Sequence, residues 1–156
     1  MKKFIISIDA GTTSNRAILF DLKGKPLFSS QKEFKQYFPK SGWVEHNPEE
    51  IWSTTRKVLK DVILKSKKLR GKVLAIGITN QRETTVLWDK KTGKTVYKAI
   101  VWQDRRQAEY CKKLKNQNKE TLIFNKTGLP IDSYFSGTKI KWILDNVPKA
   151  KKLMNK

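Results

Sequence analysis

The pattern of hydrophobic and polar positions predicts three short strands at the start of the chain. Apolar runs at residues 4–8 and 17–20 are rich in Ile, Leu and Phe, and a short polar turn separates them. A second turn at residues 23–26 (KGKP) is followed by a third predicted strand at 27–34. Runs of this length and composition are typical of strands, and tight turns join strands that lie antiparallel. We therefore predict an antiparallel meander.

A long helix and a buried strand are predicted next. Asn47, Pro48 and Glu50 form a helix start signal, with Asn as cap, Pro in the first turn and Glu three residues after the cap. The apolar stripe expected to be buried consists of Ile51, Val58, Leu59, Val62 and Ile63. Trp52 beside it is expected in the core, and Gly71 is expected to end the helix. The continuous apolar run at 73–79 predicts a strand buried on both faces.

The second half of the chain is less regular. Two further strands are predicted at 84–88 and 96–102, around a turn at 90–94. Helices are predicted at 105–115 and 119–125, and a last one from Ser136 or Thr138 until Pro148 ends it. The basic segment 149–156 is expected to fray. The pattern therefore predicts a chain of strands and helices that opens with an antiparallel meander.

Length and composition set broad limits. With 156 residues and 38% hydrophobic residues, the chain fits one globular domain. No run is apolar enough to cross a bilayer, and we expect no signal peptide. Cys111 is the only cysteine, so no internal disulfide can form. This usage suits a reducing compartment, and we expect a cytoplasmic protein without integral membrane association.

The net charge of +20 raises the possibility of a nucleic-acid-binding module. The basic residues, however, are mostly lysines scattered along the chain, whereas nucleic-acid readers concentrate basic residues and use Arg for bases and phosphates. The arginines are Arg16, Arg56, Arg70, Arg82, Arg105 and Arg106. We favour solvated lysine-rich surfaces without specific nucleic-acid recognition, and expect only nonspecific polyanion binding at low salt.

The turn between the first two strands carries candidate chemistry. Its members are Asp9, Gly11, Thr12, Thr13, Ser14 and Arg16. The hydroxyl groups and the guanidinium are donors, the glycine permits close approach, and the aspartate could hold Mg²⁺ through water. This set suits a triphosphate. An ordinary hairpin with a polar turn explains the same residues equally well, so both interpretations stay open at this point.

A second group of polar residues interrupts the strands near residue 80. Arg82 and Glu83 could grip polyol hydroxyls, because Arg donates and Glu accepts, or they could form a surface ion pair. His46 has no second His or Cys nearby, so it is not expected to bind a metal. The sequence Gly93-Lys94-Thr95 imitates the end of a phosphate-binding loop, but Trp88 stands where that motif requires its first glycine.

Several stretches, in the same order and at compatible spacing, resemble the FGGY carbohydrate kinases of the actin-like ATPase superfamily. They are residues 9–17 (DAGTTSNRA), 42–48 (GWVEHNP), 76–85 (IGITNQRETT), 99–106 (AIVWQDRR) and 127–139 (TGLPIDSYFSGTK). The last three are similar to the members that phosphorylate glycerol. The resemblance covers essentially the whole chain and implies an α/β fold. The implied domain is an actin-like ATPase, or ribonuclease H-like, domain, in which helices pack around a mixed sheet that begins with antiparallel strands.

This resemblance implies direct phosphoryl transfer from ATP, with Mg²⁺, to a terminal hydroxyl of glycerol. It implies that Thr12, Thr13, Ser14 and Arg16 line the ATP phosphate site and that Asp9 helps to organise Mg²⁺. It also implies that Arg82, Glu83, Trp102 and Tyr134 bind glycerol. Ala10 departs from the Gln that many of these kinases carry in the first motif.

The resemblance stops about a third of the way through the family's usual chain. Residues 1–156 are expected to form an incomplete N-terminal domain, with the catalytic base and the adenine-binding domain beyond Lys156. We identify no catalytic residue and expect weak or no catalysis by the chain alone. A homo-oligomer or a separate C-terminal portion could supply the remainder. The alternatives are a fragment of another sugar kinase, the basic nucleic-acid module, and a nonfunctional remnant with exposed apolar surface.

Overall fold

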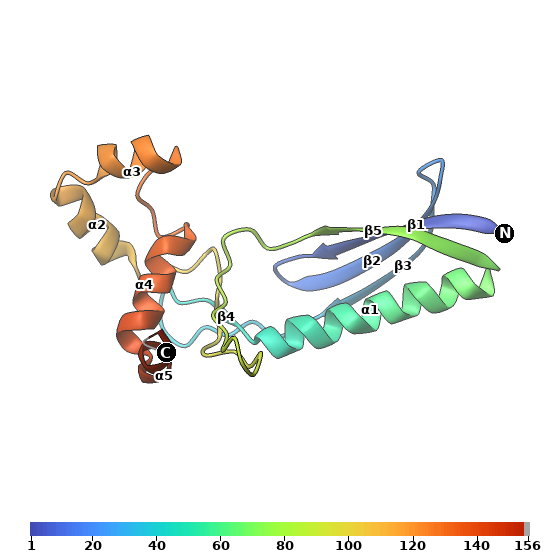
Figure 1. Ribbon diagram of the computed structural model, residues 1–156, viewed down its shortest axis with the longest axis horizontal. Coiled ribbons are helices and arrows are strands. Elements are labelled where there is room, and N and C mark those ends of the chain that lie inside the picture. Colours follow the sequence, from blue (N-terminus) through green and yellow to red (C-terminus); the bar gives the residue numbers. More distant parts are fainter. Residues whose placement is uncertain (155–156) are drawn as a thin grey trace. The chain divides into compact units, whose positions relative to one another are not determined.

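The computed structural model describes residues 1–154, which form two compact units (Figure 1). Unit 1 comprises Met1–Lys35 and Glu49–Gln81, and unit 2 comprises Gln36–Pro48 and Arg82–Lys156. Each unit has its own hydrophobic cluster. Among the helices of residues 1–154, none combines the length and the hydropathy that a membrane span requires.

Unit 1 contains a four-stranded mixed sheet with the order β3-β2-β1-β5. Strands β1 (Lys2–Ala10), β2 (Ser14–Asp21) and β3 (Pro26–Glu33) are antiparallel neighbours, which confirms the predicted meander. Strand β5 (Gly71–Thr79) pairs in parallel with β1. The turn from β1 to β2 therefore lies at the end of the sheet where β5 also ends.

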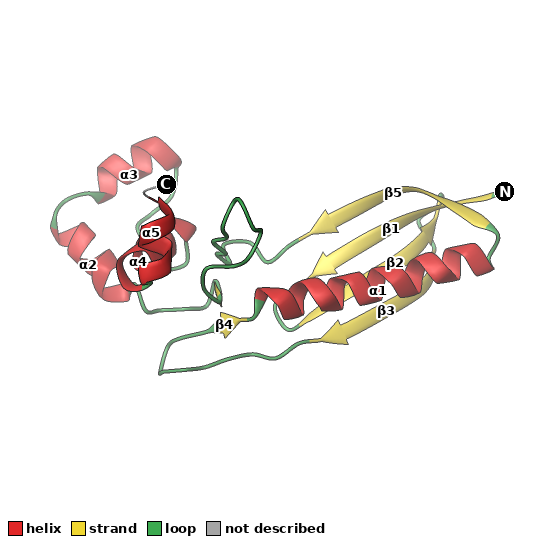
Figure 2. Ribbon diagram, turned by 60° about the horizontal axis from the view of Figure 1, so that its bottom comes forward, coloured by secondary structure: helices red, strands yellow, loops and turns green. Residues whose placement is uncertain are grey.

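Helix α1 (Pro48–Lys68) lies along one face of this sheet (Figure 2). It begins at the predicted proline, and Val58 and Val62 are fully buried in the cluster formed by β1 and β2. Trp52, expected in the core, is 59% exposed, so that prediction is wrong. The buried positions of α1 are Thr54, Val58, Val62 and Ser66, which lie four residues apart on one face of the helix. Trp52 is two positions before Thr54, so its side chain points to the opposite face.

The prediction that residues 73–79 are buried on both faces is also wrong. Leu74 is 49% exposed and Ile78 is 72% exposed. Within residues 1–154, β5 is an edge strand that pairs with β1 alone, and Val73 is its residue packed on the core cluster. An apolar run specifies what a strand can bury, but only neighbouring elements can cover it.

Gly71 begins β5 instead of ending the helix, and it has no room for a side chain. A Cβ atom there would lie 1.9 Å from the Cε2 atom of Phe4, a core residue. We expect Gly71→Ala to lower the free energy of unfolding by about 1–3 kcal/mol, because the ring and the backbone must move apart. The midpoint of urea denaturation measures this.

Gly77→Ala, on the same strand, is the matched control. A Cβ atom at Gly77 meets no atom within 4 Å. We expect the control to keep the wild-type midpoint within about 0.5 kcal/mol, as surface substitutions usually do. Equal midpoints for the two variants would contradict the proposed clash with the ring.

Unit 2 combines a two-stranded antiparallel sheet with four helices. Its elements are β4 (Glu45–His46), β6 (Ala99–Ile100), α2 (Ala108–Asn116), α3 (Glu120–Thr127), α4 (Ser136–Asn146) and α5 (Pro148–Met154). Ile100, Ile143 and Ala150 form its buried cluster. The left-handed Gly128, with a φ of 72°, ends α3, as a glycine after a helix commonly does.

Two sequence predictions for unit 2 need correction. Where strands were expected at 84–88 and 96–102, the structure has only β6 and two isolated bridges, Thr85 to Ile100 and Trp88 to Thr95. Ile100 also pairs with Glu45, so β6 lies between two short partners and builds no long ladder. The segment expected to fray forms α5 through Met154, because Pro148 is tolerated in a first helical turn. Residues 155–156 lie outside the described part.

Candidate functional site

The polar turn of unit 1 presents a carboxylate and a guanidinium side by side. Asp9 and Arg16 are partners in the β1–β2 register. Arg16 Nη2 lies 3.2 Å from Asp9 Oδ2, and the two side chains are 46% and 45% exposed. An ion pair this exposed adds little stability, so both groups can interact with a ligand at small cost.

Gly11 is required by the close approach of the backbone in this turn. Its N–H donates to the carbonyl of Ser14 at 3.0 Å, and a Cβ atom at Gly11 would lie 2.9 Å from that oxygen. The turn is also held by β3, because Gln31 Nε2 donates to Ser14 Oγ at 2.9 Å. Just beyond β3, the Phe34 N–H donates to the Thr13 carbonyl at 3.3 Å.

Asn15 connects the same turn to helix α1. Its side chain is fully buried, and Nδ2 donates to the Ile51 carbonyl at 2.9 Å and to Thr54 Oγ1 at 2.6 Å. Sequence reasoning assigned no role to Asn15 or Gln31. An amide at an inward position of an apolar strand was the signal for Asn15, whereas nothing local marked Gln31.

The donor set around Asp9 fits Mg²⁺ held largely by water and phosphate. Among residues 1–154, no group of three or more His, Cys, Asp or Glu side chains is placed to hold a metal ion. Mg²⁺ is commonly bound through one or two carboxylates together with substrate phosphates and water. One exposed carboxylate beside hydroxyl groups meets that requirement.

In unit 2, Glu83 lies at the N-terminus of α4. Its Oε2 atom accepts hydrogen bonds from Ser136 N at 2.9 Å and from Ser136 Oγ at 2.8 Å. A carboxylate is favoured there by the unpaired amides and the dipole of the helix. Glu83 also has a φ of 64°, which is uncommon for residues other than glycine and costs free energy.

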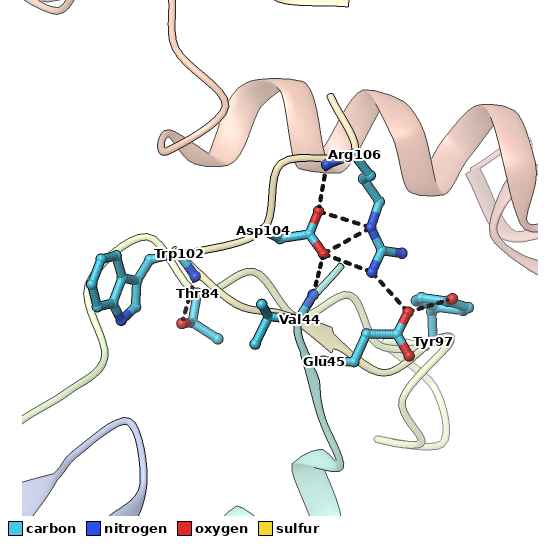
Figure 3. Close-up of polar contacts among 7 residues, drawn as sticks. All are labelled: Val44, Glu45, Thr84, Tyr97, Trp102, Asp104 and Arg106. Atoms are coloured by element: carbon cyan, nitrogen blue, oxygen red, sulfur yellow. Dashed lines mark hydrogen bonds and ion pairs between the residues drawn. The ribbon is translucent and has the colours of Figure 1, made fainter. Parts of the chain in front are cut away.

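Trp102 and Tyr134 lie beside each other in the same unit. Their ring centroids are 6.0 Å apart with an interplanar angle of 67°, and each residue is 36% exposed. The backbone N–H of Trp102 donates to Thr84 Oγ1 at 3.4 Å (Figure 3). Glu83 contacts Ser136, two residues after Tyr134, and its neighbour Thr84 contacts Trp102. The structure thus brings together Glu83, Trp102 and Tyr134, three of the four predicted polyol-binding residues. Arg82, the fourth, is exposed and forms no ion pair within residues 1–154.

A buried charge network supports the Trp102 segment (Figure 3). Arg106, whose side chain is 0% exposed, contacts Asp104 Oδ2 and Glu45 Oε1, each at 2.8 Å from Nη2. Asp104 also accepts from the Val44 N–H at 2.7 Å. Burial alone would lower the pKa of Arg106, but its bonds to both carboxylates raise it, so the guanidinium stays charged. Sequence reasoning assigned no role to this network.

Comparison with known proteins places this geometry in a family. Residues 4–156 match the family profile "FGGY family of carbohydrate kinases, N-terminal domain". The chain belongs to the FGGY family of carbohydrate kinases. The glycerol kinase of Petrotoga mobilis is 58% identical to this FGGY chain over 151 residues, which are 97% of the chain and 30% of that relative. The chain thus spans about 30% of the length of the curated relatives that it matches.

Solved structures confirm the fold of this FGGY domain. A glycerol kinase from Plasmodium falciparum with ADP superposes with a TM-score of 0.91 at 35% identity, over 99% of this chain and 31% of that one. A xylulose kinase from Lactobacillus acidophilus gives a TM-score of 0.85 at 26% identity, over 99% and 30%. The predicted α/β, actin-like ATPase class with a mixed sheet is therefore confirmed.

Proposed function

We propose that this chain is the N-terminal part of a glycerol kinase, which transfers the γ-phosphoryl group of ATP to glycerol and forms sn-glycerol 3-phosphate. The observation that carries the proposal is the cluster of Glu83, Trp102 and Tyr134 in unit 2. The 58% identity to a glycerol kinase along nearly the whole chain supports it.

The glycerol roles follow from the chemistry of these side chains. Arg82 donates to a hydroxyl, and Glu83 accepts from one through Oε1, which forms no hydrogen bond within residues 1–154. Tyr134 adds a phenolic hydrogen bond, and the Trp102 ring forms an apolar wall against the carbon chain. A larger sugar would need a roomier pocket with a different arrangement of polar groups.

The phosphate roles belong to the turn of unit 1. Thr12, Thr13 and Ser14 would donate to phosphate oxygens, and Arg16 would offset their charge. Asp9 would hold Mg²⁺, which neutralises charge on the phosphates when it is bound. In this proposal Arg16 exchanges its contact with Asp9 for one with phosphate.

We further propose that the general base and the adenine-binding wall come from the remaining part of a full-length kinase. The coverage of relatives, about 30% of their length, supports this. Catalysis needs an enclosed site that positions the reacting groups and excludes water. We therefore expect this chain to bind glycerol but to show weak or no turnover.

Two measurements on the purified chain test the proposed function. The first follows the indole N–H signals of the five tryptophans by NMR during titration with glycerol, xylulose or gluconate. We expect saturable shifts at Trp102 with glycerol, weaker effects with the sugars, and loss of the shifts in Arg82→Ala. The second measures glycerol-dependent release of ADP from Mg-ATP, where we expect little or none.

The outcomes separate the alternatives. Preference for xylulose or gluconate would assign the chain to another sugar kinase, and no binding of any polyol would overturn the proposal. Rapid ADP release that Arg82→Ala abolishes would confirm glycerol as substrate. It would also show that the chain needs no further domain.

A further inference from the structure

Lys139, in helix α4, is a lysine whose whole side chain is buried. Its exposed fraction is 0%, and it is among the largest fully buried side chains of the described residues. Lysine is almost never fully buried unless an acidic group pairs with it. Within residues 1–154, however, Lys139 forms no ion pair. The reason for its burial must therefore lie in other contacts.

The ammonium group of Lys139 reaches back to the segment that enters α4. Nζ donates to the backbone carbonyl of Tyr134, and the carbonyl of Phe135 lies 3.4 Å away. The helix dipole makes a positive charge near a helix N-terminus unfavourable. The contacts of the Lys139 ammonium group are therefore not explained by stabilisation of the α4 N-terminus. They hold the peptide group that carries the Tyr134 ring.

The held segment connects the residues proposed to bind glycerol. The Tyr134 N–H donates to Asp132 Oδ1 at 2.7 Å, so its backbone is held on both sides. Two residues later, Ser136 donates to Glu83. The Tyr134 ring contacts Trp102 at 6.0 Å and Phe135 at 5.2 Å between centroids. A shift of this backbone would move the Tyr134 ring away from the Trp102 wall.

The charge of Lys139 is set by opposing effects. Burial lowers the pKa of Lys139 to about 8, while Glu83, Asp104, Asp132 and Cys111 act to raise it. The ammonium form therefore predominates at pH 7 and is lost as the pH rises through about 8. A neutral amine is a weaker hydrogen-bond donor to a carbonyl than an ammonium group.

We propose that Lys139 is a positioning residue that holds the Tyr134 ring against Trp102, and thereby strengthens glycerol binding without touching glycerol. The inference rests on the proposed function for its ligand. Its structural part, the fixed contact between the two rings, can be measured without any ligand.

The variant that tests the inference is Lys139→Met, which keeps an unbranched side chain and removes the charge. Lys141→Met is the matched control, because Lys141 is on the same helix and its side chain is 49% exposed. In the ligand-free chain, we expect the nuclear Overhauser contacts between the Trp102 and Tyr134 rings to weaken in Lys139→Met. They should stay unchanged in the control.

The glycerol titration supplies the second readout. We expect about tenfold weaker binding in Lys139→Met at pH 7, as when a hydrogen bond to a charged group is lost, and wild-type affinity in the control. Wild-type affinity should fall between pH 7 and pH 9, whereas that of Lys139→Met should stay flat. The wild-type pH series, read by ring contacts and by affinity, tests the inference even if the variant fails to fold.

The results divide clearly. Unchanged ring contacts, or unchanged affinity with a flat wild-type pH profile, would overturn the inference and leave Lys139 a residue of the core alone. A wild-type chain that binds no glycerol would overturn the proposed function. The role of Lys139 in fixing Tyr134 would then be decided by the ring contacts of the ligand-free chain.

Discussion

Arg106→Leu is expected to lower the stability of unit 2 by about 3–5 kcal/mol, because the substitution leaves two carboxylates buried without their cation. The Glu45 and Asp104 side chains are 5% and 0% exposed, so water cannot replace the guanidinium. The loss also removes stacking, since the guanidinium lies 3.8 Å from the centroid of Trp43 and 4.6 Å from that of Trp142. Urea denaturation followed by tryptophan fluorescence measures the change.

Two companion variants show which property of Arg106 matters. Arg106→Lys keeps the charge but loses the planar fork and its stacking, so we expect an intermediate loss of stability. Arg105→Leu is the matched control, since Arg105 is the exposed neighbour, and it should change stability by less than about 0.5 kcal/mol. If Arg106→Leu proved as stable as this control, the buried network could not be what holds the Trp102 segment.

Glu83→Gln is expected to weaken glycerol binding by about 10- to 150-fold, which corresponds to loss of one hydrogen bond to a charged group. The carboxylate serves two partners: Oε2 accepts both donors of Ser136, and Oε1 is proposed to accept from glycerol. An amide has only one acceptor oxygen. If the amide oxygen introduced by Glu83→Gln keeps accepting from Ser136, the NH₂ group of the same amide faces glycerol. The glycerol hydroxyl then meets a hydrogen-bond donor where the wild type offers an acceptor.

The same variant separates the glycerol role of Glu83 from its role at the helix end. The strained backbone is unchanged by Gln, and the Ser136 contact can persist, so stability should fall by only about 0.3–1 kcal/mol from the lost charge. NMR titration gives the affinity, and urea denaturation gives the stability. Glu109→Gln, at an exposed position of α2, is the control. Wild-type affinity in Glu83→Gln would mean that Glu83 only caps α4.

Local signals in the sequence determined much of unit 1 and the ends of several helices. Two apolar runs and the turns that follow them predicted the β1–β2–β3 meander, and the signal around Pro48 predicted the start of α1. These features depend on interactions between residues close in sequence. The same holds for the polar turn from Asp9 to Arg16, whose members are neighbours within one hairpin. Motif order along the chain also indicated the family before any contact was known.

Tertiary structure alone decided which surfaces are covered and which side chains meet. The apolar run of β5 predicted burial, but its neighbours within residues 1–154 leave Ile78 exposed. Glu83 meets Ser136 across 53 positions, and Arg106 meets Glu45 across 61. Lys139 reads in sequence as one more surface lysine, yet it is buried. Burial and long-range polar contacts depend on how elements distant in sequence pack together. The periodicity or spacing of residues along one segment does not determine that packing.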